Sequence, residues 1–198
     1  MDSATSKAWG ICPGAGLDRA ARRVIVLGCP GSGKTTLSWQ LAATLRLPHV
    51  KLDDLYWQAG WRRPAEHAFL ARLDAAVGEP AWLIDGNYRR CLGVRLSRAD
   101  TVVFLDLSTW RCATRALVRG WRRARGERAS LPAAVADSGD RRGRRLDWRF
   151  WALILGFRRR VVPAMLDEIG AHTGIRLVVL HTPDDVAAFL AATKRRCG

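Results

Sequence analysis

A run of residues near the start of the chain has the types and spacing needed to bind the phosphates of a nucleotide. Residues 28–35 fit the pattern G-x-x-x-x-G-K-[ST], with the apolar run 24–27 before them and leucines at 37, 41 and 45 after them. In a strand–loop–helix context, glycines let backbone N–H groups and the helix N-terminus face phosphates. Lys34 would reach the β- and γ-phosphates, and the Thr35 hydroxyl would help to hold Mg²⁺. The residues predicted to contact ATP or GTP here are Gly28, Cys29, Pro30, Gly31, Ser32, Gly33, Lys34, Thr35 and Thr36.

Aspartates follow three other apolar runs of the chain. They are Asp53 with Asp54, then Asp85, then Asp106. In open parallel sheets, ligands bind beyond the carboxyl ends of the strands. These carboxylates are therefore expected to share a cleft with residues 28–35, which we call the phosphate loop. Lys34 and Mg²⁺ would compensate their charge once a nucleotide is bound. The alternative is that each aspartate caps the helix or turn that follows it.

Strand and helix patterns alternate along the chain, which predicts an α/β fold: a P-loop domain with a parallel five-stranded sheet and flanking helices. The expected strands are 24–27, 49–52, 81–84, 101–105 and 175–180. The expected helices are 33–46, one that begins at Pro64, 108–125, 147–170 and 183–194. The polar stretch 126–145 is expected to be a loop. Residues 1–22 show no apolar periodicity and are expected to be a loose tail before a single domain, 23–198.

The composition limits the class of protein. The chain has 198 residues and a net charge of +15, which suits polyanionic partners such as nucleotides, phosphorylated substrates or nucleic acid. An arginine-rich proteome would raise the same count without any functional cause. The odd number of cysteines shows no C-x-x-C spacing, so free thiols and no zinc site are expected. No signal peptide or membrane span is visible, and we expect a cytoplasmic monomer or homodimer.

The motifs together resemble a known family. Residues 85–89, Asp-Gly-Asn-Tyr-Arg, are similar to the Asp-Gly-Phe-Pro-Arg segment of adenylate kinases. The segments 52–57, 82–88 and 99–106, with Trp61, look like adenylate-kinase-related P-loop proteins often called DNA topology modulation (FlaR-like) proteins. This likeness runs from about residue 22 to 170. It implies a nucleoside-monophosphate-kinase-like fold with a core, a substrate arm at about 53–80 and a lid at about 115–160.

The resemblance also implies roles for single residues. Asp53 would lie near the acceptor hydroxyl and take its proton, with Asp54 as the alternative base. Asp85 and Asp106 would hold Mg²⁺ or its waters together with Thr35. Arg89 would clamp an anionic substrate group, although Tyr88 stands where nucleotide kinases have proline. The residues expected to bind the acceptor are Asp53, Asp54, Tyr56, Trp57, Trp61, Asp85, Asn87 and Arg89. The aromatic members of this set could instead be core residues.

Arginines recur at three- and four-residue spacing in the expected helix 108–125, giving it a basic face. Such a face is either simply solvated or belongs to a lid that neutralises the transferring phosphoryl group. Its place just before the polar stretch favours the lid, with Arg115 and Arg119 as the leading catalytic candidates. One of Arg158, Arg159 and Arg160 would reach the phosphates from the end of the lid, where the chain returns to the core.

The sequence thus favours an ATP-dependent phosphotransferase that uses Mg²⁺ and moves the γ-phosphoryl group to a hydroxyl of a small molecule. Thr182 and Pro183 fall where this fold borders the adenine, and no guanine-binding Asn/Thr-Lys-x-Asp signature is present, so ATP is favoured over GTP. A nucleoside or nucleotide kinase is the alternative within enzymes. An ATP-regulated nucleic-acid-binding protein is the alternative from another class, although no nucleic-acid-binding motif is visible.

Overall fold

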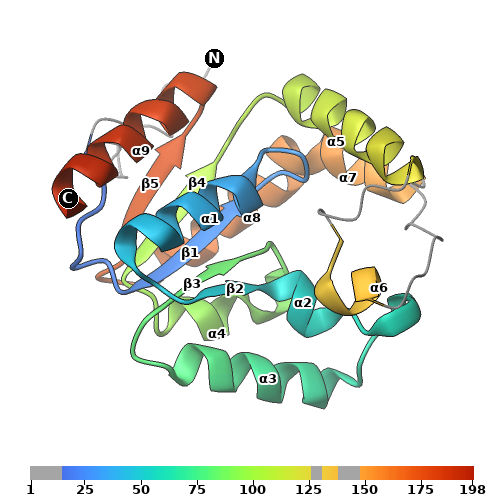
Figure 1. The fold of residues 1–198 in the computed structure, drawn as a ribbon, viewed down its shortest axis with the longest axis horizontal. Helices are drawn as coiled ribbons and strands as arrows, with labels where there is room; N and C mark the ends of the chain where they lie inside the picture. The colour runs from blue at the N-terminus through green and yellow to red at the C-terminus, as the bar shows by residue number, and fades with distance from the viewer. Residues whose placement is uncertain (1–14, 126–130, 138–147) are drawn as a thin grey trace.

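The computed structural model describes residues 15–125, 131–137 and 148–198. Its centre is one sheet of five parallel strands in the order β2-β3-β1-β4-β5 (Figure 1). The strands are β1 (Arg23–Gly28), β2 (His49–Lys51), β3 (Trp82–Asp85), β4 (Thr101–Leu105) and β5 (Arg176–Leu180). The expected α/β class and five-stranded parallel sheet are confirmed. Because β1 lies between β3 and β4, the loop that follows it opens at the point where the chain changes direction across the sheet, where ligands of such sheets bind.

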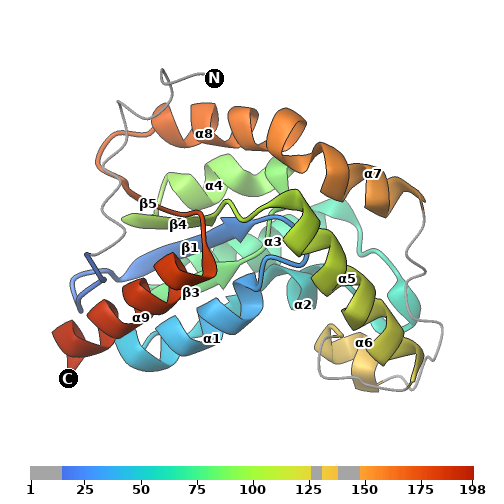
Figure 2. The ribbon, with the colours of Figure 1, turned by 90° about the horizontal axis from the view of Figure 1, so that it is seen from above.

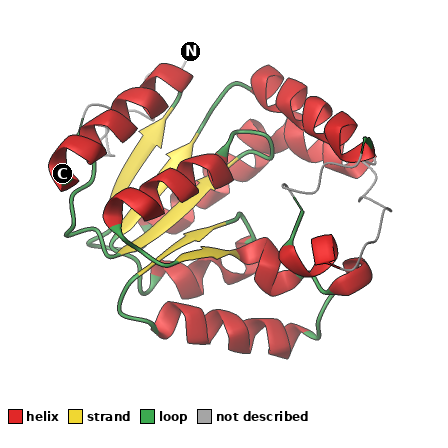
Figure 3. Cartoon of the chain, viewed as in Figure 1, coloured by secondary structure: helices red, strands yellow, loops and turns green. Residues whose placement is uncertain are grey.

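Helices cover both faces of the sheet because the strands are apolar on both sides. In β1, Val24 and Val26 belong to one buried cluster, and Ile25 and Leu27 belong to the other. The α-helices are α1 (Lys34–Leu45), α2 (Leu52–Tyr56), α3 (Glu66–Gly78), α4 (Leu92–Leu96), α5 (Thr109–Ala124), α6 (Ala133–Asp137), α7 (Trp148–Gly156), α8 (Val162–Gly170) and α9 (Pro183–Cys197). Figure 2 shows the sheet between its helical layers, with α1 and α9 on one face and α4 and α8 on the other, and Figure 3 colours the strands yellow and the helices red.

Three expected elements differ from the structure in ways that affect the site. The second strand ends at Lys51, and Asp53 and Asp54 lie in the first turn of α2, where the helix dipole favours carboxylates. The polar stretch 126–145 contains α6, although 126–130 and 138–145 lie outside the described residues. The helix expected over 147–170 is interrupted between α7 and α8 by a π-helical turn, η3 (Phe157–Val161).

The segment 15–22 is packed rather than loose, which corrects the expected tail over the part that the structure describes. Leu17 is fully buried, and its N–H donates to the Thr193 hydroxyl of α9 at 3.0 Å. A side chain at Gly16 would collide with the backbone of α9. Residues 1–14 of the expected tail, including Cys12, lie outside the described residues. Among the described helices, none combines the length and apolar character needed to cross a membrane.

Candidate functional site

The phosphate loop joins β1 to α1, as predicted. Gly28 ends the strand with φ +148°, and a Cβ there would lie 2.7 Å from the Leu105 carbonyl oxygen, so only glycine fits. The Lys34 ammonium donates to the Cys29 carbonyl at 3.1 Å across the loop. The first N–H groups of a helix lack intrahelical partners, so the start of α1 offers donors to an anion. Thr35 and Thr36 are exposed in this first turn of α1.

Helix α5 rests directly on the phosphate loop. A Cβ at Gly31, whose φ is +90°, would collide with the Cys112 carbonyl oxygen of α5. The neighbouring Cys112 thiol, together with burial, raises the pKa of the Cys29 thiol. Further along α5, the Arg115 guanidinium donates to the Ser32 carbonyl at 3.3 Å. The first turns of α5, where the expected lid begins, therefore contact the phosphate loop directly.

Three charged groups from separate elements act electrostatically on the Lys34 ammonium. Burial lowers the pKa of Lys34, while the charges of Asp85 and Asp53 act in the opposite direction and Arg119 adds to the lowering. Burial likewise lowers the pKa of Arg119, and the Asp53 carboxylate opposes this effect. The sequence-predicted residues Lys34, Asp53, Asp85 and Arg119 therefore lie within electrostatic reach of one another, contributed by the phosphate loop, α2, β3 and α5.

Asp85 has an oxygen suited to a cation or its water. Its side chain is buried at the end of β3, and Oδ2 has no hydrogen-bond partner among the described residues. The nearest basic atom paired with it is Nε2 of His49, at 3.7 Å. Hard cations such as Mg²⁺ prefer carboxylate and hydroxyl oxygens. The Asp85 carboxylate and the exposed Thr35 hydroxyl therefore fit the expected metal role.

The two adjacent acids of α2 have different surroundings. Asp53 accepts a hydrogen bond from the Tyr88 hydroxyl at 2.7 Å and lies near Lys34 and Arg119. Asp54 instead accepts from the backbone N–H of Ala133 at 2.9 Å, at the start of α6. Lys51 also lies 3.9 Å from the Asp54 carboxylate. Of the two candidate bases, Asp53 thus bonds to Tyr88 and acts on the charges of Lys34 and Arg119, and Asp54 caps α6.

The Tyr88 hydroxyl gives a testable pH dependence. Burial, and then the Asp53 charge, raise the pKa of Tyr88 above its ordinary value of 10.0. Above pH 10 the unfolded chain therefore loses this proton while the folded protein keeps it, so stability falls as the pH rises. We expect the unfolding free energy of wild type to fall relative to that of Tyr88→Phe between pH 9 and pH 11, as the linkage between proton binding and folding requires. Urea titrations at several pH values measure this difference, and a pH-independent difference would contradict the assignment.

Asn87 clamps the start of the phosphate loop. Its Nδ2 donates to the Gly28 carbonyl at 2.8 Å, and its Oδ1 accepts from the Gly28 N–H at 3.2 Å. Asn87 therefore has a structural role at the loop, and its expected contact with the substrate stays a prediction. Arg89, in the 3₁₀ turn η2 (Arg89–Cys91), is exposed.

Asp106 forms an ion pair with an arginine of η3. Both of its oxygens accept hydrogen bonds from Arg158 of η3, each at 2.9 Å, and Nδ1 of His181 lies 3.4 Å from Oδ2. A metal role for Asp106 would require this ion pair to open. Thr182, expected near the adenine, caps α9: its hydroxyl accepts from the Asp185 N–H at 3.0 Å, and Pro183 is the first residue of the helix.

The aromatic residues after Asp53 pack against one another. Tyr56 makes edge contacts with Trp57 and Phe69, with ring centroids 5.0 and 5.2 Å apart, and a tilted contact with Tyr88. Trp57 is only 7% exposed and also contacts Trp61, at 5.3 Å. The core-packing alternative therefore describes Trp57, while Tyr56, Trp61 and Tyr88 are only partly buried, and Tyr88 contacts Asp53.

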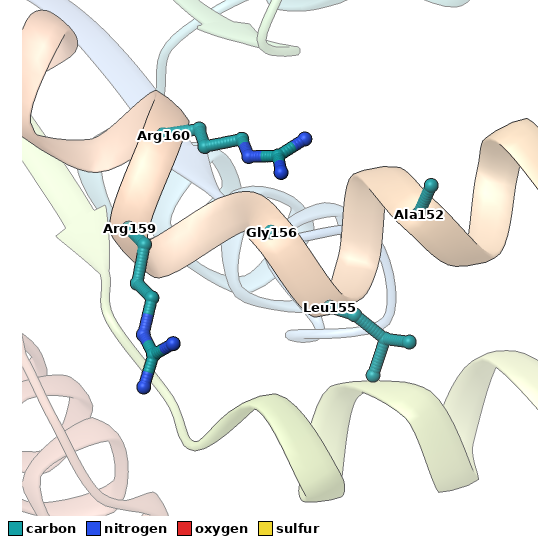
Figure 4. Close-up of a pocket in the computed structure, with 5 residues that line it drawn as sticks. All are labelled: Ala152, Leu155, Gly156, Arg159 and Arg160. Atoms are coloured by element: carbon teal, nitrogen blue, oxygen red, sulfur yellow. The ribbon is translucent and has the colours of Figure 1, made fainter.

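A hollow of about 300 Å³ lies on α7 and η3, and it is lined by Ala152, Leu155, Gly156, Arg159 and Arg160. In Figure 4, Leu155 points toward α5, and the two arginines extend on different sides of the helix. The hollow contains neither the phosphate loop nor the carboxylates. This hollow is therefore separate from the candidate site at the loop and its acids.

The glycine-framed loop that joins the central strand β1 to α1, and that contains Lys34, defines an α/β fold of the P-loop class. The sequence matches no protein-family model, and it matches no curated protein. Shikimate kinase from Acinetobacter baumannii, solved in complex with shikimate, has 16% identity and a TM-score of 0.52 over 89% of this chain and 92% of its own. A gluconokinase from Sinorhizobium meliloti has 15% identity and a TM-score of 0.49 over 89% of this chain and 94% of its own. The likeness to shikimate kinase shows that this chain has the fold of P-loop kinases.

Proposed function

We propose that this protein is an ATP- and Mg²⁺-dependent phosphotransferase that moves the γ-phosphoryl group of ATP to a hydroxyl group of a small molecule. One observation carries the proposal: the charges of Asp85, Arg119 and Asp53, which come from three separate elements, all act on the pKa of the phosphate-loop lysine, Lys34. Transfer to a hydroxyl needs carboxylates near the phosphates, to take the hydroxyl proton and to hold the metal ion. The kinase fold supports the same conclusion.

The residues divide the work as follows. The phosphate loop and Lys34 bind the β- and γ-phosphates, and Arg115 and Arg119 of α5 balance the charge of the group in transit. Asp53 accepts the proton of the acceptor hydroxyl, whose oxygen attacks the γ-phosphorus while the bond to the bridging β-phosphate oxygen breaks and ADP leaves. Thr35 and Asp85 would hold Mg²⁺, which, when bound, supplies positive charge to the phosphate oxygens.

The acceptor side lies between α2 and the turn after β3. Asp53 and the partly buried rings of Tyr56, Trp61 and Tyr88 line this side, and Arg89 is exposed next to it. An aromatic wall beside a carboxylate suits a ring-bearing acceptor with a free hydroxyl. We further propose that residues 53–80 form the substrate arm and 115–160 the lid, as in the FlaR-like adenylate-kinase relatives that the sequence resembles, and that the protein works in the cytoplasm as a monomer or homodimer.

The test has two parts. Isothermal calorimetry should detect binding of ATP with Mg²⁺ and weaker binding of GTP. A coupled ADP-release assay across sugars, hydroxy acids, nucleosides, nucleotides and aminoglycosides should then identify the acceptor class, and turnover on nucleosides or nucleotides alone would favour the nucleoside- or nucleotide-kinase alternative. The absence of nucleotide binding by well-folded protein with Mg²⁺ present would refute the proposal. Sequence-specific DNA binding that survives high salt would instead support a nucleic-acid-binding protein.

A further inference from the structure

An arginine that the sequence analysis did not single out is completely buried beneath the site. Arg95 of α4 has no exposed surface, and its guanidinium donates to the carbonyls of Gly86 at 2.7 Å, Tyr88 at 3.2 Å and Cys91 at 3.3 Å. Burial lowers its pKa to about 10, so it remains a cation at neutral pH. Burying a guanidinium among carbonyls is costly, and a leucine there would fill the core more cheaply. The three hydrogen bonds therefore fix the backbone that carries these carbonyls.

The segment that Arg95 holds is the turn after β3, residues 86–88. This turn connects the two halves of the site. Asn87 clamps Gly28 at the start of the phosphate loop, and the Tyr88 hydroxyl donates to Asp53. The Cys91 thiol adds a further hydrogen bond to the Tyr88 carbonyl, at 3.2 Å. One short turn thus contacts both the loop that would bind ATP and the carboxylate that would act as base.

We propose that Arg95 is a positioning residue: by holding the turn 86–88, it sets the Tyr88 hydroxyl, and through it the Asp53 carboxylate, opposite the phosphate loop. This inference rests on the proposed phosphotransfer function for its catalytic consequence, but not for its structural one. A guanidinium is required because its planar fork reaches several carbonyls at fixed angles, whereas a lysine ammonium is a single point of charge. Tyr88 remains a donor because its raised pKa keeps the phenol protonated.

The structural half can be tested without any enzyme assay, because the chain has only two tyrosines. In protein labelled with 3-fluorotyrosine, ¹⁹F NMR gives one resonance for each, and Tyr56→Phe assigns them. We expect Asp53→Asn and Arg95→Lys each to move or broaden the Tyr88 resonance. The exposed Arg98, one turn away on the same segment, provides the matched control, and Arg98→Lys should leave that resonance in place. An unchanged Tyr88 resonance in Arg95→Lys would overturn the inference.

The catalytic half uses ATP hydrolysis with water as the acceptor. We expect Arg95→Lys and Tyr88→Phe each to lower kcat about tenfold, because a small displacement of the base is costly. The dissociation constant for ATP should change less than about threefold, and the double variant should lose no more than Arg95→Lys alone, because both changes act on Asp53 through one path. Losses that multiply in the double variant would overturn the shared path. Tyr88→Phe removes one oxygen from a partly exposed ring, so it keeps the test valid if Arg95→Lys does not fold.

The two proposals fail in different ways. If wild type neither binds nor hydrolyses ATP, the proposed function fails, while the ¹⁹F measurement still decides whether Arg95 positions Tyr88. If wild type is active and Arg95→Lys matches it in kcat and in spectrum, only the role of Arg95 is refuted.

Discussion

Replacing Lys34 by methionine is expected to abolish ATP-dependent phosphotransfer, by at least about 10²-fold, without unfolding the protein. The ammonium would act on the phosphate oxygens as charge develops, and methionine fills its space without supplying charge. In the nucleotide-free protein, burial lowers the Lys34 pKa, which means that the surroundings disfavour its charge. The melting temperature of Lys34→Met should therefore equal or exceed that of wild type. Calorimetric titration with ATP and thermal unfolding measure the two effects.

The exposed Lys194 in the last turn of α9 provides the control for loss of one positive charge. Lys194→Met should bind ATP and turn it over as wild type does. If both lysine variants lost activity equally, the effect would come from the overall charge of the protein. A Lys34→Met protein with wild-type turnover would rule out the phosphate loop as the catalytic centre.

An Asp53→Asn variant is expected to bind ATP within about threefold of wild type but to lose transfer by about 10²- to 10⁴-fold. Asparagine keeps an oxygen that accepts the Tyr88 hydrogen bond, so the turn 86–88 should stay in place. What it lacks is the ability to take the proton of the attacking hydroxyl. ADP release with the acceptor found in the substrate screen, or with water, measures the loss.

The neighbouring acid makes the comparison sharp. Asp54→Asn is the same chemical change one residue away, and its side-chain oxygen can still accept from the Ala133 N–H at the start of α6. This variant should keep transfer within about threefold. If Asp54→Asn lost activity and Asp53→Asn did not, the assignment of the two acids would be reversed.

The sequence was sufficient wherever a function depends on local order. The phosphate loop is recognisable because its glycines, lysine and threonine are consecutive, and the sheet because its strands are apolar runs. That the charge of Asp85 acts on Lys34 could also be predicted, since the ends of parallel strands share one edge, although Asp53 proved to lie in α2 rather than at a strand end. Arg119 could be predicted from its spacing on a basic helix that precedes the polar stretch.

Other features depend on partners distant in the sequence. Arg95 has the one signal that could have found it, an arginine between Leu92 and Leu96 on the apolar face of a short helix. Nothing local shows that Arg158 would engage both oxygens of Asp106. The choice between Asp53 and Asp54 likewise needed α6, which the polar composition around it concealed.

The hydrogen bond from Ala133 to Asp54 joins two regions that a kinase of this fold would use for different ligands. In the sequence, α6 falls in the middle of the proposed lid, between α5 and α7. In the structure it contacts the 3₁₀ turn η1 (Ala59–Trp61) of the proposed substrate arm. Neither region can shift without carrying the other or breaking this cap. Occupancy of the nucleotide site should thus alter affinity for the acceptor, and thermodynamic reciprocity requires the acceptor to alter affinity for ATP by the same factor.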